Sequence, residues 1–260
     1  MRPEGKTAVM ADRARGEVEG DDALTALQRK LELFPTPPWA ARAGGELINE
    51  IDPGRWWCWE PACGLGHMAY GLADYFARVH ATDVHDHGWD GQHGPPLDFL
   101  SPEADRIDQC DWIVTNPPFG VAAEFVQAAL RRAQRGVAIL ARTALLESAG
   151  RFPMFFPHLS GGPVGTAALY AIAPFFERVP ITLGRWEPKA STATAYAWFV
   201  WMQPGAAADM SHKTRRLISL RPEVWPIAPG TRDRLTRPED ARLFGVKAAA
   251  PLFDPSQPSS

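Results

Sequence analysis

The tetrapeptide Asn116-Pro117-Pro118-Phe119 combines groups suited to chemistry at an amino nitrogen. An amine attached to an aromatic ring is a poor nucleophile, because its lone pair is delocalised into the ring. The Asn116 side-chain oxygen and the Pro117 carbonyl can accept both amino hydrogens and direct the lone pair toward an electrophile. The prolines stiffen the loop, and Phe119 offers a face on which a planar base can stack. The simpler alternative is a Pro-Pro turn capped by asparagine.

A glycine-rich turn lies upstream, over residues 60–66. Gly64 and Gly66 allow a tight turn and a close approach of the backbone to a ligand. Asp83, about 20 residues further on, stands where a ribose-binding carboxylate is expected. The spacing Gly64-x-Gly66-x-x-Ala69 also fits a dinucleotide fingerprint, and a strand-to-helix turn without any ligand has the same pattern. The turn therefore predicts an adenosine-containing cofactor without identifying which one.

Two details favour S-adenosylmethionine over a dinucleotide. Glu60 precedes Gly64 by four residues and places a carboxylate where it could bind the cofactor's ammonium, which a pyrophosphate would not tolerate. Thr36 and nearby backbone N–H groups could bind the cofactor's carboxylate. Downstream, Asp98 could accept the adenine amino group beside the apolar ring of Phe99, although Asp98 could equally cap a helix or turn.

These residues need elements that bring them to one edge of a sheet. Strand and helix patterns alternate along the chain, which predicts crossover units on a mostly parallel sheet with helices on both faces, an α/β fold. Ligands of such sheets bind at the carboxyl ends of the strands. The expected strands cover 55–60, 79–82, 111–115, 136–141, 169–173 and 194–202. One expected helix begins near Asp21, and the others cover 39–50, 66–75 and 122–132.

The composition indicates a globular enzyme-sized domain. The 260 residues suffice for one large α/β domain with appendages, and 45% hydrophobic with 22% charged residues is ordinary for a globular chain. The N-terminus does not resemble a signal peptide, and the apolar run 195–202 is far shorter than the ~20 residues that span a bilayer. We therefore expect a cytoplasmic location and no membrane association.

Neither a disulfide framework nor a metal site is expected. The cysteines show no paired spacing, and the histidines after the second strand lack matching ligands, so we expect them to rim the adenine pocket or face solvent. These residues are Cys58, Cys63, Cys110, His80, His85, His87 and His93. The net charge is −3, but residues 204–260 hold nine Lys/Arg and six Asp/Glu, which makes this segment +3 and the remainder −6. A basic segment permits contact with nucleic acid.

The order and content of these motifs resemble those of amino-type DNA adenine-N6 methyltransferases with the gamma arrangement, in which the cofactor motifs precede the catalytic one. Residues 184–189 and 196–201 look like those of small phage and prophage members. The resemblance covers about residues 34–202. It implies a Rossmann-like, doubly wound class I methyltransferase sheet of seven strands with the last strand antiparallel. It also implies methylation of a flipped adenine in DNA, with release of S-adenosylhomocysteine.

The expected site follows from the motifs and this resemblance. The catalytic residues are Asn116, Pro117, Pro118 and Phe119. The cofactor-binding residues are Phe34, Thr36, Pro37, Glu60, Pro61, Ala62, Cys63, Gly64, Gly66, Asp83, Val84, Asp98, Phe99 and Asn116. On the substrate side, we expect Trp186 to pack against the base opposite Phe119, with Arg185 and Lys189 on phosphates. The alternative for Trp186 is a side chain that covers the edge of the core.

The chain divides into an N-terminal arm and helix (1–33), a catalytic domain (34–203) and a Pro/Arg-rich extension (204–260). Because the extension is shorter than the target-recognition domains of related enzymes, we expect a short or relaxed DNA sequence preference. Two other functions remain open. One is N-methylation of RNA bases or protein glutamine, which poses the same orientation problem. The other is a nicotinamide-dependent oxidoreductase or a non-catalytic nucleotide-binding module, which the glycine turn alone would allow.

Overall fold

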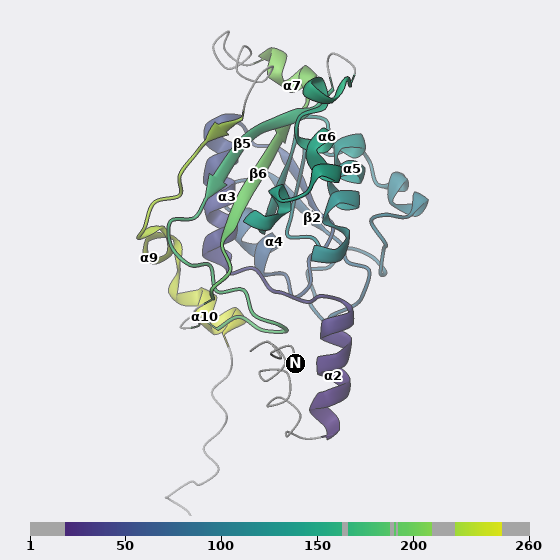
Figure 1. Ribbon diagram of the computed structural model, residues 1–260. Helices are drawn as coiled ribbons and strands as arrows, with labels where there is room; N and C mark the ends of the chain where they lie inside the picture. Colours follow the sequence, from purple (N-terminus) through teal and green to yellow (C-terminus); the bar gives the residue numbers. More distant parts are fainter. Residues whose placement is uncertain (1–18, 163–165, 188–189, 191, 210–221, 246–260) are drawn as a thin grey trace, which may run out of the picture.

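A twisted sheet forms the centre of the protein. The computed structural model describes residues 19–162, 166–187, 190, 192–209 and 222–245 (Figure 1). The sheet has seven strands in the order β2-β1-β3-β4-β6-β5-β7. The strands are β1 (Trp57–Glu60), β2 (Arg78–Ala81), β3 (Trp112–Thr115), β4 (Gly136–Arg142), β5 (Ala168–Pro174), β6 (Tyr196–Met202) and β7 (Glu223–Val224).

The predicted α/β sheet is confirmed, including its one antiparallel member. β6 runs antiparallel to both β4 and β5, whereas every other neighbouring pair is parallel. The seventh strand lies in the segment 204–260, where the sequence predicted no strand. This strand, β7, pairs with β5 at the sheet's edge. A strand of two residues, flanked by Pro222 and Trp225, carries too little periodicity to be recognised in the sequence.

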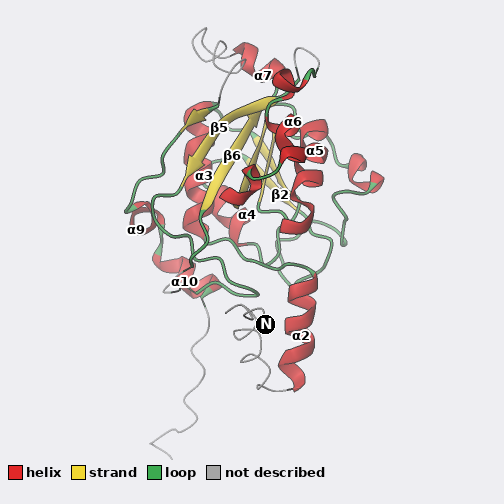
Figure 2. Ribbon diagram, viewed as in Figure 1, coloured by secondary structure: helices red, strands yellow, loops and turns green. Residues whose placement is uncertain are grey.

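Helices cover both faces of the sheet (Figure 2). Trp112 and Val114 of β3 pack with α3 (Pro38–Ile51) and α4 (His67–Leu72), while Ile113 between them packs with α5 (Ala122–Arg132) on the opposite face. Burial on both sides explains why these strands read as continuous apolar runs. The remaining helices and helical turns are α2 (Glu19–Lys30), α6 (Phe152–Phe155), α7 (Pro204–Asp209), α9 (Thr231–Leu235), α10 (Pro238–Phe244), η2 (Pro102–Arg106), η3 (Phe119–Val121), η4 (Thr143–Leu146), η5 (Ala149–Arg151) and η6 (Pro157–Ser160).

A buried ion pair ties the C-terminal segment to the body. Arg42 of α3 donates to both carboxylate oxygens of Asp240 in α10, at 2.6 and 2.8 Å. The same guanidinium donates to the Leu235 carbonyl and to Asp74, each at 2.8 Å. Arg42 is 1% exposed and Asp240 is 0% exposed. The Arg42 guanidinium makes four hydrogen bonds, and three of them go to Leu235 and Asp240, so it attaches the C-terminal segment to α3. Loss of Arg42 or of Asp240 would leave the charge of the other one buried.

We expect Asp240→Ala to lower the free energy of unfolding by roughly 3 kcal/mol, since it removes the buried two-oxygen partner of Arg42 and leaves the guanidinium with Asp74 alone as a carboxylate partner. Urea unfolding followed by circular dichroism would measure the loss. The matched control is Glu46→Ala, which removes an exposed partner of Arg234 and should cost at most about 1 kcal/mol. Equal losses in the two variants would contradict a structural role for the buried pair.

Candidate active site

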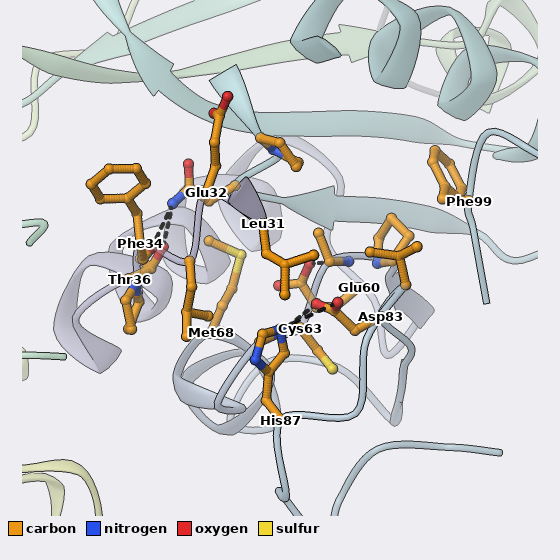
Figure 3. A pocket seen from close by; sticks show the side chains of 18 of the residues that line it. Leu31, Glu32, Phe34, Thr36, Glu60, Cys63, Met68, Asp83, His87 and Phe99 are labelled. Carbon is orange, nitrogen blue, oxygen red and sulfur yellow. Dashed lines mark hydrogen bonds and ion pairs between the residues drawn. The ribbon is translucent and has the colours of Figure 1, made fainter. Parts of the chain in front are cut away.

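A cavity of about 890 Å³, open to solvent at its mouth, lies at the carboxyl ends of β1 and β3 (Figure 3). Segments far apart in the sequence meet there because parallel strands end at the same edge. The residues predicted from sequence that line it are Phe34, Thr36, Glu60, Pro61, Ala62, Cys63, Gly64, Asp83, Val84, Asp98, Phe99, Asn116 and Pro118. Leu31, Glu32, Met68, His87 and others line it too, and of these the sequence pointed only to His87. Pro37 and Gly66 lie at the starts of α3 and α4.

The glycine turn takes the backbone conformation that its residues predicted. Gly64 has φ of 50° and Gly66 has φ of 80°, both in the left-handed region. A Cβ atom at Gly66 would lie 2.1 Å from the Trp89 ring, so both the angle and the space require glycine. The Gly64 N–H donates to Asp83 at 2.8 Å. The turn and the end of the second strand are thereby joined into one wall of the cavity.

The Asp83 carboxylate is oriented by three groups. It accepts hydrogen bonds from the backbone N–H groups of Gly64 and His85, at 2.8 and 3.0 Å. The His87 Nε2 atom lies 3.5 Å from its Oδ1. Asp83 is only 7% exposed. A carboxylate oxygen can accept more than one hydrogen bond, so this fixed group can still receive a pair of ligand hydroxyls.

Glu60 is a carboxyl group buried at the floor of the cavity. The Thr115 hydroxyl donates to its Oε1 at 2.6 Å and the Ala62 N–H donates to the same atom at 3.1 Å. Burial raises the pKa of Glu60 to about 8, against the opposing effect of these two hydrogen bonds. The group therefore retains its proton at neutral pH unless a cation binds beside it. Such a site suits a ligand that brings an ammonium or sulfonium charge.

The Asn116 side chain is held in one orientation. Its Nδ2 donates to the Phe34 carbonyl at 3.2 Å and to the Thr36 hydroxyl at 3.1 Å (Figure 3). Its Oδ1 is buried and has no hydrogen-bond partner among the described residues. An acceptor in such a place costs free energy unless a ligand supplies a donor. Asn116 lines the cavity, and within the described residues its Oδ1 is an unpaired acceptor with almost no surface exposed.

Phe119 is not among the residues that line the cavity. Its backbone N–H donates to the Glu32 carboxylate, and its ring centroid is 5.1 Å from that of Phe34. The Arg142 guanidinium carbon lies 3.9 Å from the same ring. Glu32 has φ of 49°, a left-handed value that is rare for residues other than glycine. No local pattern could have revealed Glu32 or Arg142, because their contacts join segments distant in sequence.

Asp98 and Phe99 occupy the adenine end of the predicted site. The Asp98 Oδ1 accepts a hydrogen bond from the Leu100 N–H at 2.9 Å, so the residue caps a turn and lines the cavity at once. The Phe99 ring is 1% exposed and packs between Trp59 and Phe125. Val84, in contrast, is 53% exposed at the rim. These side chains form an apolar slot with one acceptor at its edge.

The expectation for Trp186 is wrong. Its side chain is 1% exposed, and its backbone forms a bridge with Gly245. A base cannot stack on an indole that is enclosed by the protein, so Trp186 belongs to the core, as the alternative interpretation held. Arg185 is exposed and paired with Glu187, and it does not line the cavity. Lys189 lies outside the described residues.

Metal and membrane sites are not found in the described part of the chain. There, no group of three or more His, Cys, Asp or Glu side chains is placed to hold a metal ion. Cys58, Cys63 and Cys110 are unpaired and buried. Within the same residues, no helix has the length and apolar character needed to cross a bilayer.

The sequence matches no protein-family model and no curated protein. Among solved structures, a protein from Listeria monocytogenes described as a class I S-adenosylmethionine-dependent methyltransferase has a TM-score of 0.54 and 13% identity, over 80% of this chain and 70% of that chain. The protein has the class I methyltransferase fold. At this identity the similarity concerns the fold and not the activity.

Two further structures are less similar. One is a modification subunit of a type I restriction enzyme from Vibrio vulnificus, with a TM-score of 0.48 and 14% identity over 89% of this chain and 59% of that chain. The other is described as an RNA methyltransferase from Pyrococcus horikoshii, with a TM-score of 0.48 and 15% identity over 63% of this chain and 83% of that chain. Neither is close enough to decide between DNA and RNA.

We expect the melting temperature of the Glu60→Gln variant to increase relative to that of the wild-type protein as the pH rises from about 4.5 to about 8. The folded protein holds the Glu60 proton up to about pH 8, whereas the unfolded chain releases it near the ordinary value of 4.5. Wild-type stability therefore falls across this window, and glutamine removes that loss. Differential scanning fluorimetry should show the difference widening by roughly 10 °C.

Glu50→Gln, at an exposed position of α3, is the control for this measurement and should keep a constant difference from wild type. A pH-independent difference for Glu60→Gln would mean that the buried carboxyl is ionised in the folded protein.

Proposed function

We propose that the protein transfers a methyl group from S-adenosylmethionine to the exocyclic N6 amino group of adenine in DNA. The observation that carries the proposal is the Asn116 side chain, whose amide hydrogens are engaged while its oxygen stays unpartnered beside the cavity. An acceptor held in this way suits an incoming amino group. The motif order described above supports adenine in DNA as the acceptor.

The cavity residues fit S-adenosylmethionine. The Glu60 carboxyl would meet the ammonium of the methionine part, and the Thr36 hydroxyl, which accepts from Asn116, still has a hydrogen to donate to the carboxylate. Asp83 would accept the ribose hydroxyls, and Asp98 with Phe99 would bind adenine. When bound, this cofactor supplies an electrophilic methyl group on a positively charged sulfur.

In the proposed reaction, the residues of this chain bind and orient the exocyclic amine of the target base. The Asn116 Oδ1 and the Pro117 carbonyl accept its two hydrogens, and Phe119 stacks on the ring that bears it. As the nitrogen lone pair would form the new N–C bond, the bond between the methyl group and sulfur would break. Positive charge would develop on the nitrogen, its hydrogens would become stronger donors, and the surplus proton would pass to solvent after the transfer. Both hydrogen bonds therefore strengthen in the transition state, which is where they accelerate the reaction. No strong base is needed before attack.

Glu60 argues against the nicotinamide-dependent alternative. The carboxyl lies at the floor of the cavity with its Oε1 accepting from Ala62 in the glycine turn, where a pyrophosphate would be bound in such an enzyme. A buried carboxyl group at that place offers a pyrophosphate no positive charge, and it would repel the phosphates if it lost its proton. Transfer to RNA or to a protein glutamine uses the same acceptor geometry and is the second candidate.

We expect methyl-labelled S-adenosylmethionine to label DNA when the protein is incubated separately with DNA, RNA and protein mixtures. Nucleoside digestion and mass spectrometry should then identify N6-methyladenine. Heat-denatured protein provides the background. Label confined to RNA or to protein would overturn the DNA assignment while leaving N-methyl transfer in place, and the absence of label from all three would overturn the proposed function.

We expect Asn116→Ala to reduce methyl transfer by at least about 100-fold, because the developing positive charge loses its fixed acceptor. Cofactor affinity, measured by isothermal titration calorimetry, should change less than about threefold, since the other contacts to the cofactor remain. Asn49→Ala, at an exposed position of α3, is the matched control and should leave both quantities unchanged. A large loss of affinity with turnover preserved would show that Asn116 is not catalytic.

A further inference from the structure

Arg142 stands beside the catalytic loop although no sequence motif marks it. Thr115, the last residue of β3, pairs with Ile139 of β4, and β4 continues for three residues to Arg142. The end of β4 therefore runs alongside the loop that carries Phe119. The guanidinium carbon of Arg142 lies 3.9 Å from the centroid of the Phe119 ring.

The charge of Arg142 has no carboxylate partner within the described residues, and the side chain is exposed. Its polar neighbour is the hydroxyl of buried Tyr196, directly across the β4–β6 pair. Burial raises the pKa of Tyr196, and the hydrogen bond with Arg142 opposes that shift. Within the described residues, this hydroxyl and the Phe119 ring hold the guanidinium.

Several other arginines have partners. Arg132 pairs with Asp105, Arg135 with Asp52, and Arg185 with Glu187. Arg151 donates to the carbonyl groups of Ala144 and Leu145 in the preceding helical turn η4. Arg142 therefore combines two features. Its charge has no carboxylate partner within the described residues, and it lies against Phe119, the ring on which the target base would stack.

A planar guanidinium at this distance covers part of the ring surface that an incoming base would use. An exposed cation–π contact is weak, so a base can displace it. We propose that the target base displaces Arg142 from Phe119, and that the freed guanidinium then binds a backbone phosphate beside the target nucleotide. The inference rests on the proposed action on nucleic acid. Arginine suits the role because its fork matches two phosphate oxygens.

We expect Arg142→Ala to raise the KM for an oligonucleotide about tenfold, with kcat changed less than about twofold. The slope of log KM against log salt concentration should fall by about 1, the loss of one phosphate contact. Arg142→Lys keeps a positive charge and should restore the slope. Arg131→Ala removes an exposed charge from α5, and should alter neither KM nor slope.

Two results would overturn this role. The first is an Arg142→Ala variant whose KM and salt slope equal those of Arg131→Ala. The second is a fall in kcat with KM unchanged, which would make Arg142 a support for the Phe119 ring and not a phosphate contact. Both results require an assay in which the wild-type protein methylates the oligonucleotide. They are therefore distinct from a failure of the proposed function, in which the wild-type protein itself would transfer no methyl group to nucleic acid.

Discussion

The hydrogen bond between Thr115 and Glu60 joins the two halves of the site. Glu60 ends β1, Thr115 ends β3, and the two strands are parallel neighbours. Their pairing brings the glycine turn and the catalytic loop out of the sheet at one edge, with 2.6 Å between the two side-chain oxygens. Because the two loops start from adjacent strand ends, the rigid sheet fixes their positions relative to each other. The sheet could therefore set the distances that the proposed methyl transfer demands.

The orientation of Asn116 depends on a segment that crosses this edge from the N-terminal side. Phe34 and Thr36 receive the two amide hydrogens, and Glu32 receives the N–H of Phe119. Residues at the start of the chain thus determine which atom of the asparagine faces a ligand. The left-handed backbone at Glu32 is the conformation that lets its carboxylate reach the loop. Strain of this kind is tolerated where neighbouring contacts hold it, and it is common at functional sites.

The substrate side is built differently from the cofactor side. The cofactor cavity consists of buried, hydrogen-bonded groups whose positions leave little freedom. Around Phe119, by contrast, Arg142 is exposed and weakly held. The expected partner, Trp186, is enclosed in the core next to the segment that Arg42 anchors through Asp240. A rigid cavity beside a weakly held arginine would suit the proposed reaction, in which the protein must accommodate a displaced base.

The sequence alone determined the fold class and the outline of the cofactor cavity. Strand ends, glycine positions and prolines act locally, so Gly64, Gly66 and the catalytic tetrapeptide could be interpreted from their own neighbours. The cavity gathers most of the predicted cofactor residues for the same reason. Tertiary structure decided what depends on contacts between distant segments. Those contacts select the free Oδ1 of Asn116, bury Trp186, place Glu32 and Arg142 on the catalytic loop, and add β7 to the sheet. Such outcomes follow from packing, which no periodicity or spacing along the chain records.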